Sequence, residues 1–457
     1  MMSNSQLIFS KTLKMLSIFL IILHFGCSGG DDSNSDSTPS PNPEIIVNDN
    51  LISFGQVYIN TSSESQSLGV IGNNLTEPVN ISVSGPYKIS LDDIDFVNNV
   101  QLQPSPQSQI FIKFFPTETG LNVGNLTFQS TDFEEITEVT LTGTGITVIH
   151  SYSTFNQQAL GFGGGFNQSA SQVFNLHEDL SNISQIKMFL QIDCPTTGCD
   201  DWDRFANVKV KDPVSGSWFE IGRYITPYWV GTQQLDRGLE FDVTDFKSLL
   251  TGTVELRIYI ENWTAKADIV TIDFDFIEGT PDYQYYAISE VLGYHVNSID
   301  GVPYGVSHNF DLDKTIQMPS NVESGQFRTI ISGWGHATPN DIGGRPCAEW
   351  CFRTHNIKIN GSSSFQHYMG PIGCASNPIN NQNPGNWQPN RAGWCPGMVV
   401  PVRLDNIDLI SSGSSFNFEY DFEDWVSDEL GGNAYYATSV YVVVKSSTPI
   451  TNPVVTD

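Results

Sequence analysis

Apolar and polar residues alternate in short runs along most of the chain after about residue 45, with turn residues between the runs. In the stretch 254–263, the alternate positions 254, 256, 258 and 260 are branched aliphatic residues, which places Glu261 on the face turned away from the core. Helical periodicity is almost absent, apart from a possible turn at 243–250. The pattern predicts an all-β fold.

Clusters of turn residues divide this pattern into three β-rich units. Residues 45–146 form the first, which resembles the immunoglobulin-like (Ig-like) accessory sandwiches of bacterial surface proteins and contains no obvious catalytic group. We expect the second unit at 148–280 and the third at 281–457. No Walker loop or dinucleotide fingerprint occurs, so we expect no nucleotide cofactor.

The N-terminal segment has the features of an export signal. Two lysines precede an apolar run at 15–23, which is too short to span a bilayer. Cys27 follows a small residue, and residues 1–27 resemble a bacterial lipoprotein signal with a lipidated cysteine. We expect a flexible tether at 28–44 and attachment to the outer membrane or cell surface only through the lipid. A plain secretory signal, which gives a secreted or periplasmic protein, is the alternative.

Charge and composition narrow the class of partner. The chain carries 21 Lys+Arg and 50 Asp+Glu, a formal net charge of −29, so most of its surface repels a phosphate backbone. We therefore expect no nucleic-acid partner. The 39 Gly and 24 Pro agree with short strands joined by tight turns.

Cysteine spacing suggests disulfides. The chain has 7 cysteines, and setting Cys27 aside leaves 6, an even number in an exported protein. Six cysteines can pair in many ways, and proximity alone suggests Cys194–Cys199, Cys347–Cys351 and Cys374–Cys395. A metal site using Cys347 and Cys351 with His336 or His355 is the rival interpretation, which the oxidising compartment disfavours.

Two carboxylates lie in or beside these short cysteine loops. Glu349 lies between Cys347 and Cys351, and Asp203 follows Cys199 by four residues. A catalytic carboxylate must hold its angle to the substrate, and small covalent loops provide that rigidity. Ordinary turn acids beside structural bridges are the alternative.

Tryptophan and arginine residues near these acids suggest a carbohydrate ligand. Sugar rings pack on flat aromatic walls while their hydroxyls bond to acids and arginines. The candidates are Trp202, Trp263, Trp334, Trp394, Arg204 and Arg391. Burial in the core is the commoner fate of tryptophan, and a surface ion pair is the commoner role of an isolated arginine.

Five motifs carry a resemblance to a known family. They occur at 194–208 (CPTTGCDDWDRFANV), 225–231 (ITPYWVG), 332–336 (SGWGH), 347–355 (CAEWCFRTH) and 390–397 (NRAGWCPG). In the same order they resemble the peptide-N-glycosidase F family. The resemblance covers roughly 149–457 and leaves out the Ig-like unit.

The resemblance implies two antiparallel jelly rolls side by side, a substrate cleft at their interface and no metal or coenzyme. It implies the three disulfides named above and Asp203 as the primary catalytic acid, supported by Glu349 and Glu261. Three positions depart from the family pattern, namely Pro346, Phe205 and Asn262. Asn262 is expected to adjust sugar contacts at most.

The implied reaction is hydrolysis of the amide between asparagine and the first N-acetylglucosamine of an N-linked glycan. The expected partners are N-glycosylated peptides and glycoproteins, bound by a monomer. An endo-glycosidase is one alternative, because a carboxylate pair and tryptophans also serve sugar-bond cleavage. A glycan-binding surface lectin on a jelly-roll scaffold is the other.

Overall fold

The computed structural model describes residues 42–457, except 295–300, 342–343, 345, 408–409, 411 and 431–432. The signal segment 1–27, Cys27 and nearly all of the expected tether lie outside the described residues. Regular structure in the described part consists of strands and two short 3-10 helices, η1 (Thr244–Phe246) and η3 (Cys374–Ser376). The all-β prediction is confirmed, and η1 lies within the turn expected at 243–250. None of the described helices is long and apolar enough to cross a membrane.

The N-terminal unit is a sandwich of two sheets. Its strands are β1 (Glu44–Val47), β2 (Leu51–Tyr58), β3 (Gln66–Asn73), β4 (Val79–Val83), β5 (Tyr87–Ser90), β6 (Asn99–Leu102), β7 (Ser108–Phe114), β8 (Gly120–Ser130) and β9 (Phe133–Ile146). One sheet has the order β1-β3-β7-β5 and the other β2-β9-β8-β4-β6, with β2 parallel to β9. In β7, Ile110, Ile112 and Phe114 are buried, as the alternation predicted.

The next unit is the first jelly roll. Its strands are β10 (Ile149–Ser153), β11 (Gln158–Leu160), β12 (Ser169–Asn175), β13 (Ile183–Asp193), β14 (Phe205–Lys211), β15 (Trp218–Ile225), β16 (Leu239–Asp242), β17 (Thr253–Ile260) and β18 (Asp268–Glu278). The order β10-β18-β13-β16, with β11 beside β18, faces the order β12-β17-β14-β15. The alternating aliphatic side chains of β17 are buried between these sheets.

The second jelly roll completes the chain. Its strands are β19 (Tyr285–Tyr294), β20 (Val302–Pro303), β21 (Asp313–Gln317), β22 (Ser324–Trp334), β23 (His336–Ala337), β24 (Cys347–Ala348), β25 (Thr354–Ile359), β26 (Ser362–Tyr368), β27 (Val402–Asn406), β28 (Ser415–Asp421), β29 (Tyr435–Ser446) and β30 (Val454–Thr456). The sheet β19-β29-β22-β27, with β20 beside β29, faces β26-β25-β28-β21-β30. The small pair β23-β24 positions the Glu349 loop.

Buried contacts join the two jelly rolls. Phe205 of the first packs in one cluster with Trp334 and Trp394 of the second. At the same interface, the fully buried Arg223 pairs with Glu220 of its own strand at 2.8 Å. Its Nη1 also donates across the interface, to Ser332 Oγ at 2.9 Å and to the Ala437 carbonyl at 2.6 Å. A buried charge that is fully hydrogen-bonded in this way fixes the orientation of its surroundings.

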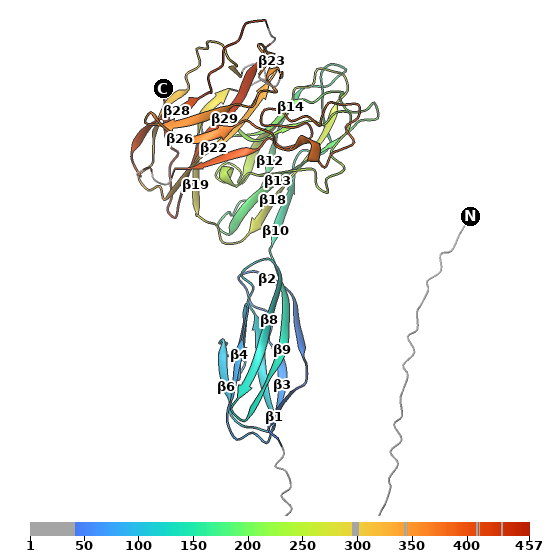
Figure 1. The fold of residues 1–457 in the computed structure, drawn as a ribbon, viewed down its shortest axis with the longest axis vertical. Coiled ribbons are helices and arrows are strands. Elements are labelled where there is room, and N and C mark those ends of the chain that lie inside the picture. The colour runs from blue at the N-terminus through green and yellow to red at the C-terminus, as the bar shows by residue number, and fades with distance from the viewer. Residues whose placement is uncertain are drawn as a thin grey trace, which may run out of the picture.

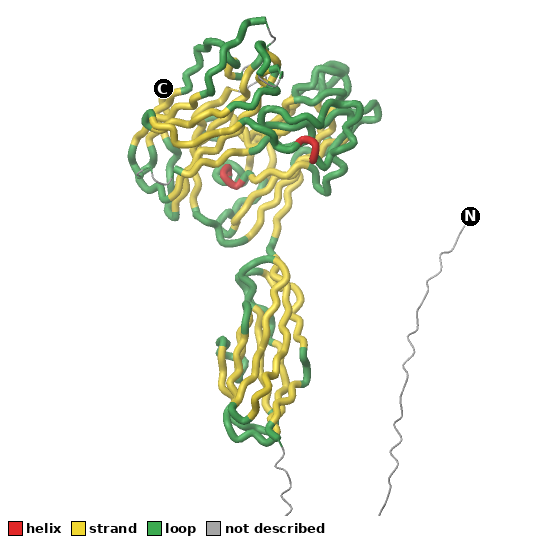
Figure 2. Tube along the Cα trace, in the orientation of Figure 1, coloured by secondary structure: helices red, strands yellow, loops and turns green. Residues whose placement is uncertain are grey.

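The two jelly rolls lie side by side, and the N-terminal sandwich projects from one end of the pair (Figure 1). Figure 2 shows the same arrangement, with strands in every unit and long loops gathered on the jelly rolls. Only two residues separate the end of β9 from the start of β10. Thr147 lies in this connection, and its Oγ1 donates to the Glu278 carbonyl at 2.6 Å. This hydrogen bond ties the connection between the sandwich and the first jelly roll to β18.

Candidate active site

One buried guanidinium joins two of the expected acids. Arg391 is 1% exposed and lies in the long loop before β27. Its Nε donates to Glu349 Oε1 at 3.0 Å, and its Nη2 lies 3.4 Å from Asp203 Oδ2. Asp203 belongs to the first jelly roll and Glu349 to the second, so this arginine brings together acids that are far apart in the sequence.

Further contacts fix the direction of the Arg391 side chain. Nη2 also donates to the Tyr228 hydroxyl at 3.3 Å, and the other donors reach carbonyl oxygens of the same loop. The guanidinium carbon lies 4.5 Å from the centroid of the Trp350 ring and 5.0 Å from that of Trp394, within cation–π range. The positive charge is therefore held in place before any substrate binds.

Asp203 has the environment of a proton-transferring carboxyl. It lies just before β14, close to the Cys194–Cys199 disulfide. Burial raises the pKa of Asp203 to about 6, with Arg391 lowering it and the charge of Glu349 raising it. Its Oδ2 lies at ion-pair distance from Arg391, and a hydrogen bond with Tyr228 also lowers the pKa of Asp203. A carboxyl with this pKa changes protonation readily near neutral pH.

Glu349 is held by its backbone as well as its side chain. Its N–H donates to the Gly335 carbonyl at 3.0 Å, and its carbonyl accepts from Ala392 at 2.7 Å. The Cys347–Cys351 disulfide closes the loop around it. Glu349 Oε2 lies 3.3 Å from His336 Nε2, and this contact raises the pKa of His336.

Glu261 lies on the Asp203 side of the site. It follows β17, and its N–H donates to the Phe205 carbonyl at 2.9 Å, two residues after Asp203. Burial raises the pKa of Glu261 to about 7, while a hydrogen bond with Trp263 and the charge of Arg204 lower it. Arg204 itself donates from Nε to Asp200 Oδ2 at 2.5 Å.

Exposed aromatic rings accompany these acids. Trp202 is 59% exposed and Trp263 is 52% exposed, so both rings are available to a sugar face. The ring of Phe162, also exposed, lies 5.1 Å from that of Trp263. Sugar binding by Trp202 and Trp263 therefore stays a prediction.

Four other residues expected to contact the substrate are buried. Trp334 and Trp394 are 9% and 1% exposed, and their rings stack on each other at 4.3 Å in the interface between the jelly rolls. The two rings therefore pack inside the interface and do not present an open face to a sugar. Arg391 is 1% exposed and orients the two acids, and its expected contact with the substrate stays a prediction. Asn262, expected to adjust sugar contacts, is fully buried as well.

The cysteines follow the disulfide interpretation. The structure has Cys194–Cys199, Cys347–Cys351 and Cys374–Cys395, so the thiols of the proposed metal site are covalently paired. His355, its other proposed ligand, is fully buried and packs against the ring of Tyr436. The described residues contain no group of three or more metal-ligating side chains.

Sequence reasoning missed three residues of the site. Tyr228 and Trp350 occur within the recognised motifs, but nothing in their spacing distinguished them from core residues. His336 was considered only as a metal ligand. Tyr228 lies beside Arg391 only across the contact between the two jelly rolls, while Trp350 and His336 reach Arg391 and Glu349 through loops of the second jelly roll. No local sequence pattern encodes either arrangement.

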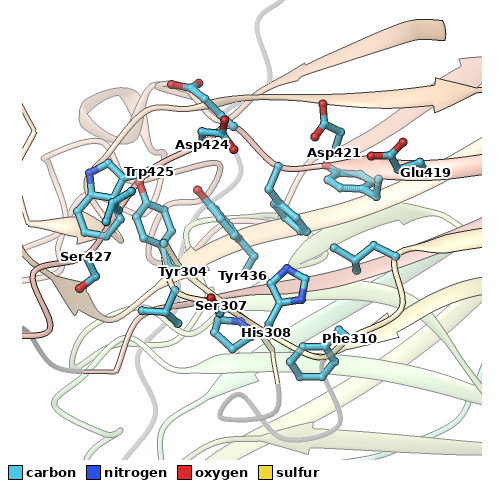
Figure 3. Close-up of a pocket in the computed structure, with 18 of the residues that line it drawn as sticks. Tyr304, Ser307, His308, Phe310, Glu419, Asp421, Asp424, Trp425, Ser427 and Tyr436 are labelled. Carbon is cyan, nitrogen blue, oxygen red and sulfur yellow. The ribbon is translucent and has the colours of Figure 1, made fainter. Parts of the chain in front are cut away.

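A separate hollow lies on the second jelly roll (Figure 3), with a volume of about 910 Å³. Tyr304, Trp425 and Tyr436 line one part of it and acids such as Asp421 another. None of the residues described above at Asp203, Glu349 or Glu261 lines it. Its acidic side chains agree with the negative net charge of the whole chain, so they do not mark the hollow as a second functional site.

Comparison with known proteins agrees with this geometry. Residues 210–276 match the family model "Peptide-N-glycosidase F, N terminal", and residues 305–442 match "Peptide-N-glycosidase F, C terminal". A relative from Elizabethkingia miricola, peptide-N(4)-(N-acetyl-beta-D-glucosaminyl)asparagine amidase F, is 55% identical over 304 residues, which are 66% of this chain and 86% of the relative.

Two solved structures extend the comparison. That of PNGase F, a glycosylasparaginase from Flavobacterium meningosepticum, superposes with a TM-score of 0.67 at 54% identity and covers 68% of this chain and 100% of its own. PNGF-II, at 11% identity, has a TM-score of 0.52 over 84% of this chain and 89% of its own, and shows a shared fold. By sequence identity and coverage, the chain belongs to the peptide-N-glycosidase F family.

Proposed function

We propose that this protein hydrolyses the amide bond between asparagine and the first N-acetylglucosamine of N-linked glycans. The whole glycan leaves as a glycosylamine, and the asparagine becomes aspartate. One observation carries the proposal: in a member of this family, Arg391 holds Asp203 and Glu349 together at the interface of two jelly rolls.

In the reaction, a water molecule attacks the carboxamide carbon, and the carbon–nitrogen bond breaks once the nitrogen has gained a proton. Asp203 carries out the proton transfer at this amide. Its raised pKa suits a group that is protonated during part of the cycle. Glu349 acts through an ordered water, and Arg391 balances the negative charge that develops.

The sugar is held on the opposite side from Glu349. Glu261 binds the chitobiose core, and the exposed rings of Trp202 and Trp263 pack on the sugar faces. Arg204, whose side chain is 17% exposed, is close enough to Glu261 to lower its pKa and contributes positive charge there. These roles match each group's burial: the proton-transferring acid is enclosed and the sugar-binding rings are open.

The test is incubation of a defined N-glycopeptide with the purified protein, followed by mass spectrometry of both products. The proposal predicts a peptide that contains aspartate and a glycan that retains both core sugars. A peptide that retains one sugar identifies an endo-glycosidase. An unchanged glycopeptide that binds the protein identifies a lectin.

Outside the active site, we propose that the mature protein is a monomer attached to the outer membrane through lipid on Cys27. The N-terminal sandwich then acts as a spacer between membrane and enzyme, in agreement with its projection from the jelly rolls (Figure 1). Expression in a bacterial host with labelled palmitate tests the anchor. Label in the wild type and none in Cys27→Ser supports it, while a soluble unlabelled wild type contradicts it.

A further inference from the structure

The loop between β17 and β18 carries two groups that the proposed function uses. Glu261 and Trp263 both lie on it, and the Trp263 ring is more than half exposed. An exposed ring receives little support from a hydrophobic core. Its position therefore depends on how the rest of the loop is held.

Asn262 holds this loop from inside. Its side chain is fully buried, although the next residue, Trp263, is exposed and the preceding one, Glu261, is partly buried. Nδ2 donates to the Lys266 carbonyl at 2.7 Å and to Asp268 Oδ2 at 3.2 Å. Oδ1 accepts from the Thr264 N–H at 2.8 Å. The oxygen and the nitrogen of the Asn262 amide therefore both hold the backbone of the turn.

Asp268, the first residue of β18, is an unusual partner for this amide. It is 1% exposed, and among the described residues its Oδ1 has no hydrogen-bond partner. Burial raises the pKa of Asp268 to about 7, the bond from Asn262 lowers it, and the nearby charge of Asp200 raises it again. A buried carboxyl with an unsatisfied oxygen is costly, and packing alone favours an apolar residue here.

The same loop is also tied to the segment that carries the catalytic acid. Thr264 Oγ1 lies 3.3 Å from Asp200 Oδ1 and 3.2 Å from Asn262 Oδ1, and Lys266 Nζ pairs with Asp201. The other oxygen of Asp200 accepts from Arg204 at 2.5 Å, and Arg204 directly follows Asp203. Movement of the loop therefore reaches the segment that carries Asp203 as well as Glu261.

We propose that Asp268 is a positioning residue of this amidase, which acts by holding Asn262 and the loop around it. The loop presents Glu261 and Trp263 to the sugar, so the inference rests on the proposed function. Asp268 is enclosed and contacts no substrate itself. Its effect is on substrate binding before any effect on proton transfer.

The test compares Asp268→Ala and Asn262→Ala, the double variant, and Asp268→Asn. Both alanine changes remove the bond between Asn262 and Asp268, and Asn262→Ala also removes the bonds to Lys266 and Thr264. KM for a glycopeptide is therefore expected to rise about tenfold in Asp268→Ala and at least as much in Asn262→Ala, with a smaller change in kcat. The double variant is expected to be no worse than Asn262→Ala alone, because Asp268 acts through its contact with Asn262. Asp268→Asn keeps an acceptor oxygen and is expected to retain the wild-type KM.

A buried acid elsewhere on β18 provides the control. Asp275 is 3% exposed and bonds Ser151 at 2.7 Å and Arg237 at 2.5 Å, at the end of the strand away from the loop. Asp275→Ala is expected to lower the melting temperature without changing KM. If Asp268→Ala behaves like this control, its role is structural and the inference is overturned.

Other outcomes also decide the question. An unchanged KM in Asn262→Ala overturns the inference even if Asp268→Ala does not fold, and so does an Asp268→Asn variant that is as impaired as the alanine variant. Affinity for the glycopeptide, measured by calorimetry in an Asp203→Asn background, reports on positioning without turnover. A wild type that binds but releases no glycan then counts against the proposed function alone.

Discussion

Replacing Asp203 by asparagine is expected to stop catalysis and also to stabilise the protein above about pH 6. The Asp203 side chain is 13% exposed, and burial is the main reason that its pKa rises from 3.8 to about 6. In the unfolded chain this carboxyl ionises near its ordinary pKa. Between about pH 4 and 6 the unfolded state therefore loses its proton first, and the free energy of unfolding falls as the pH rises.

The magnitude follows from the same values. A rise in pKa from 3.8 to about 6 corresponds to about 3 kcal/mol of ionisation free energy. Some exposure remains, so we expect Asp203→Asn to gain about 1–3 kcal/mol at pH 8 and nothing at pH 4. For a unit of this size, each kcal/mol shifts the melting temperature by about 2–4 °C. The lost proton carrier lowers kcat by about 1,000-fold or more.

Calorimetric melting of wild type and variant at both pH values is the assay. Asp275→Asn supplies a control of opposite sign, because hydrogen bonds from Arg237 and Ser151 hold the pKa of Asp275 below its usual range despite the opposing effect of burial. A gain that is equal at pH 4 and pH 8 refutes the reasoning, since it does not come from the charge. A lower melting temperature at pH 8 refutes it as well.

Glu349→Gln is expected to lower kcat by about 100-fold or more, and Glu261→Gln to raise KM about tenfold with a smaller loss of kcat, which steady-state kinetics on one glycopeptide distinguish. The reverse pattern contradicts the assigned roles. Replacing Cys347 and Cys351 by serine removes a disulfide that closes a very short loop. Its loss is expected to lower the free energy of unfolding by about 2 kcal/mol and to release the Glu349 backbone. Turnover is expected to fall more than thermal stability, and unchanged turnover counts against the positioning role. Deleting 28–146 is expected to leave a folded enzyme, which circular dichroism and glycopeptide assays check.

The sequence was sufficient for the fold class because each strand encodes its own buried face. In β17, the alternation alone identified the buried aliphatic residues and left Glu261 outside. The short cysteine loops likewise made Asp203 and Glu349 candidates, and the resemblance of the surrounding motifs implied their catalytic roles. Both signals come from residues close together in the sequence, so they can be read without the structure.

The other side chains at the site depend on contacts between the jelly rolls. The sequence suggested that Trp334 and Trp394 bind sugar, but the two rings stack inside the interface. The position of a tryptophan in a motif does not show whether its side chain is buried. Tyr228 joins the site through its contacts with Asp203 and with Arg391 of the other jelly roll. The unsatisfied carboxyl of Asp268 was equally invisible, since its burial comes from the packing of the whole sandwich.

Hydrolysis of an N-glycopeptide in heavy-oxygen water tests the central claim most directly. Attack of water on the carboxamide carbon places one heavy oxygen in the carboxyl group of the new aspartate. The account therefore predicts a labelled peptide that carries no sugar, formed by the wild type and not by Asp203→Asn. An unlabelled peptide that still carries N-acetylglucosamine, with the label on the released glycan, contradicts it.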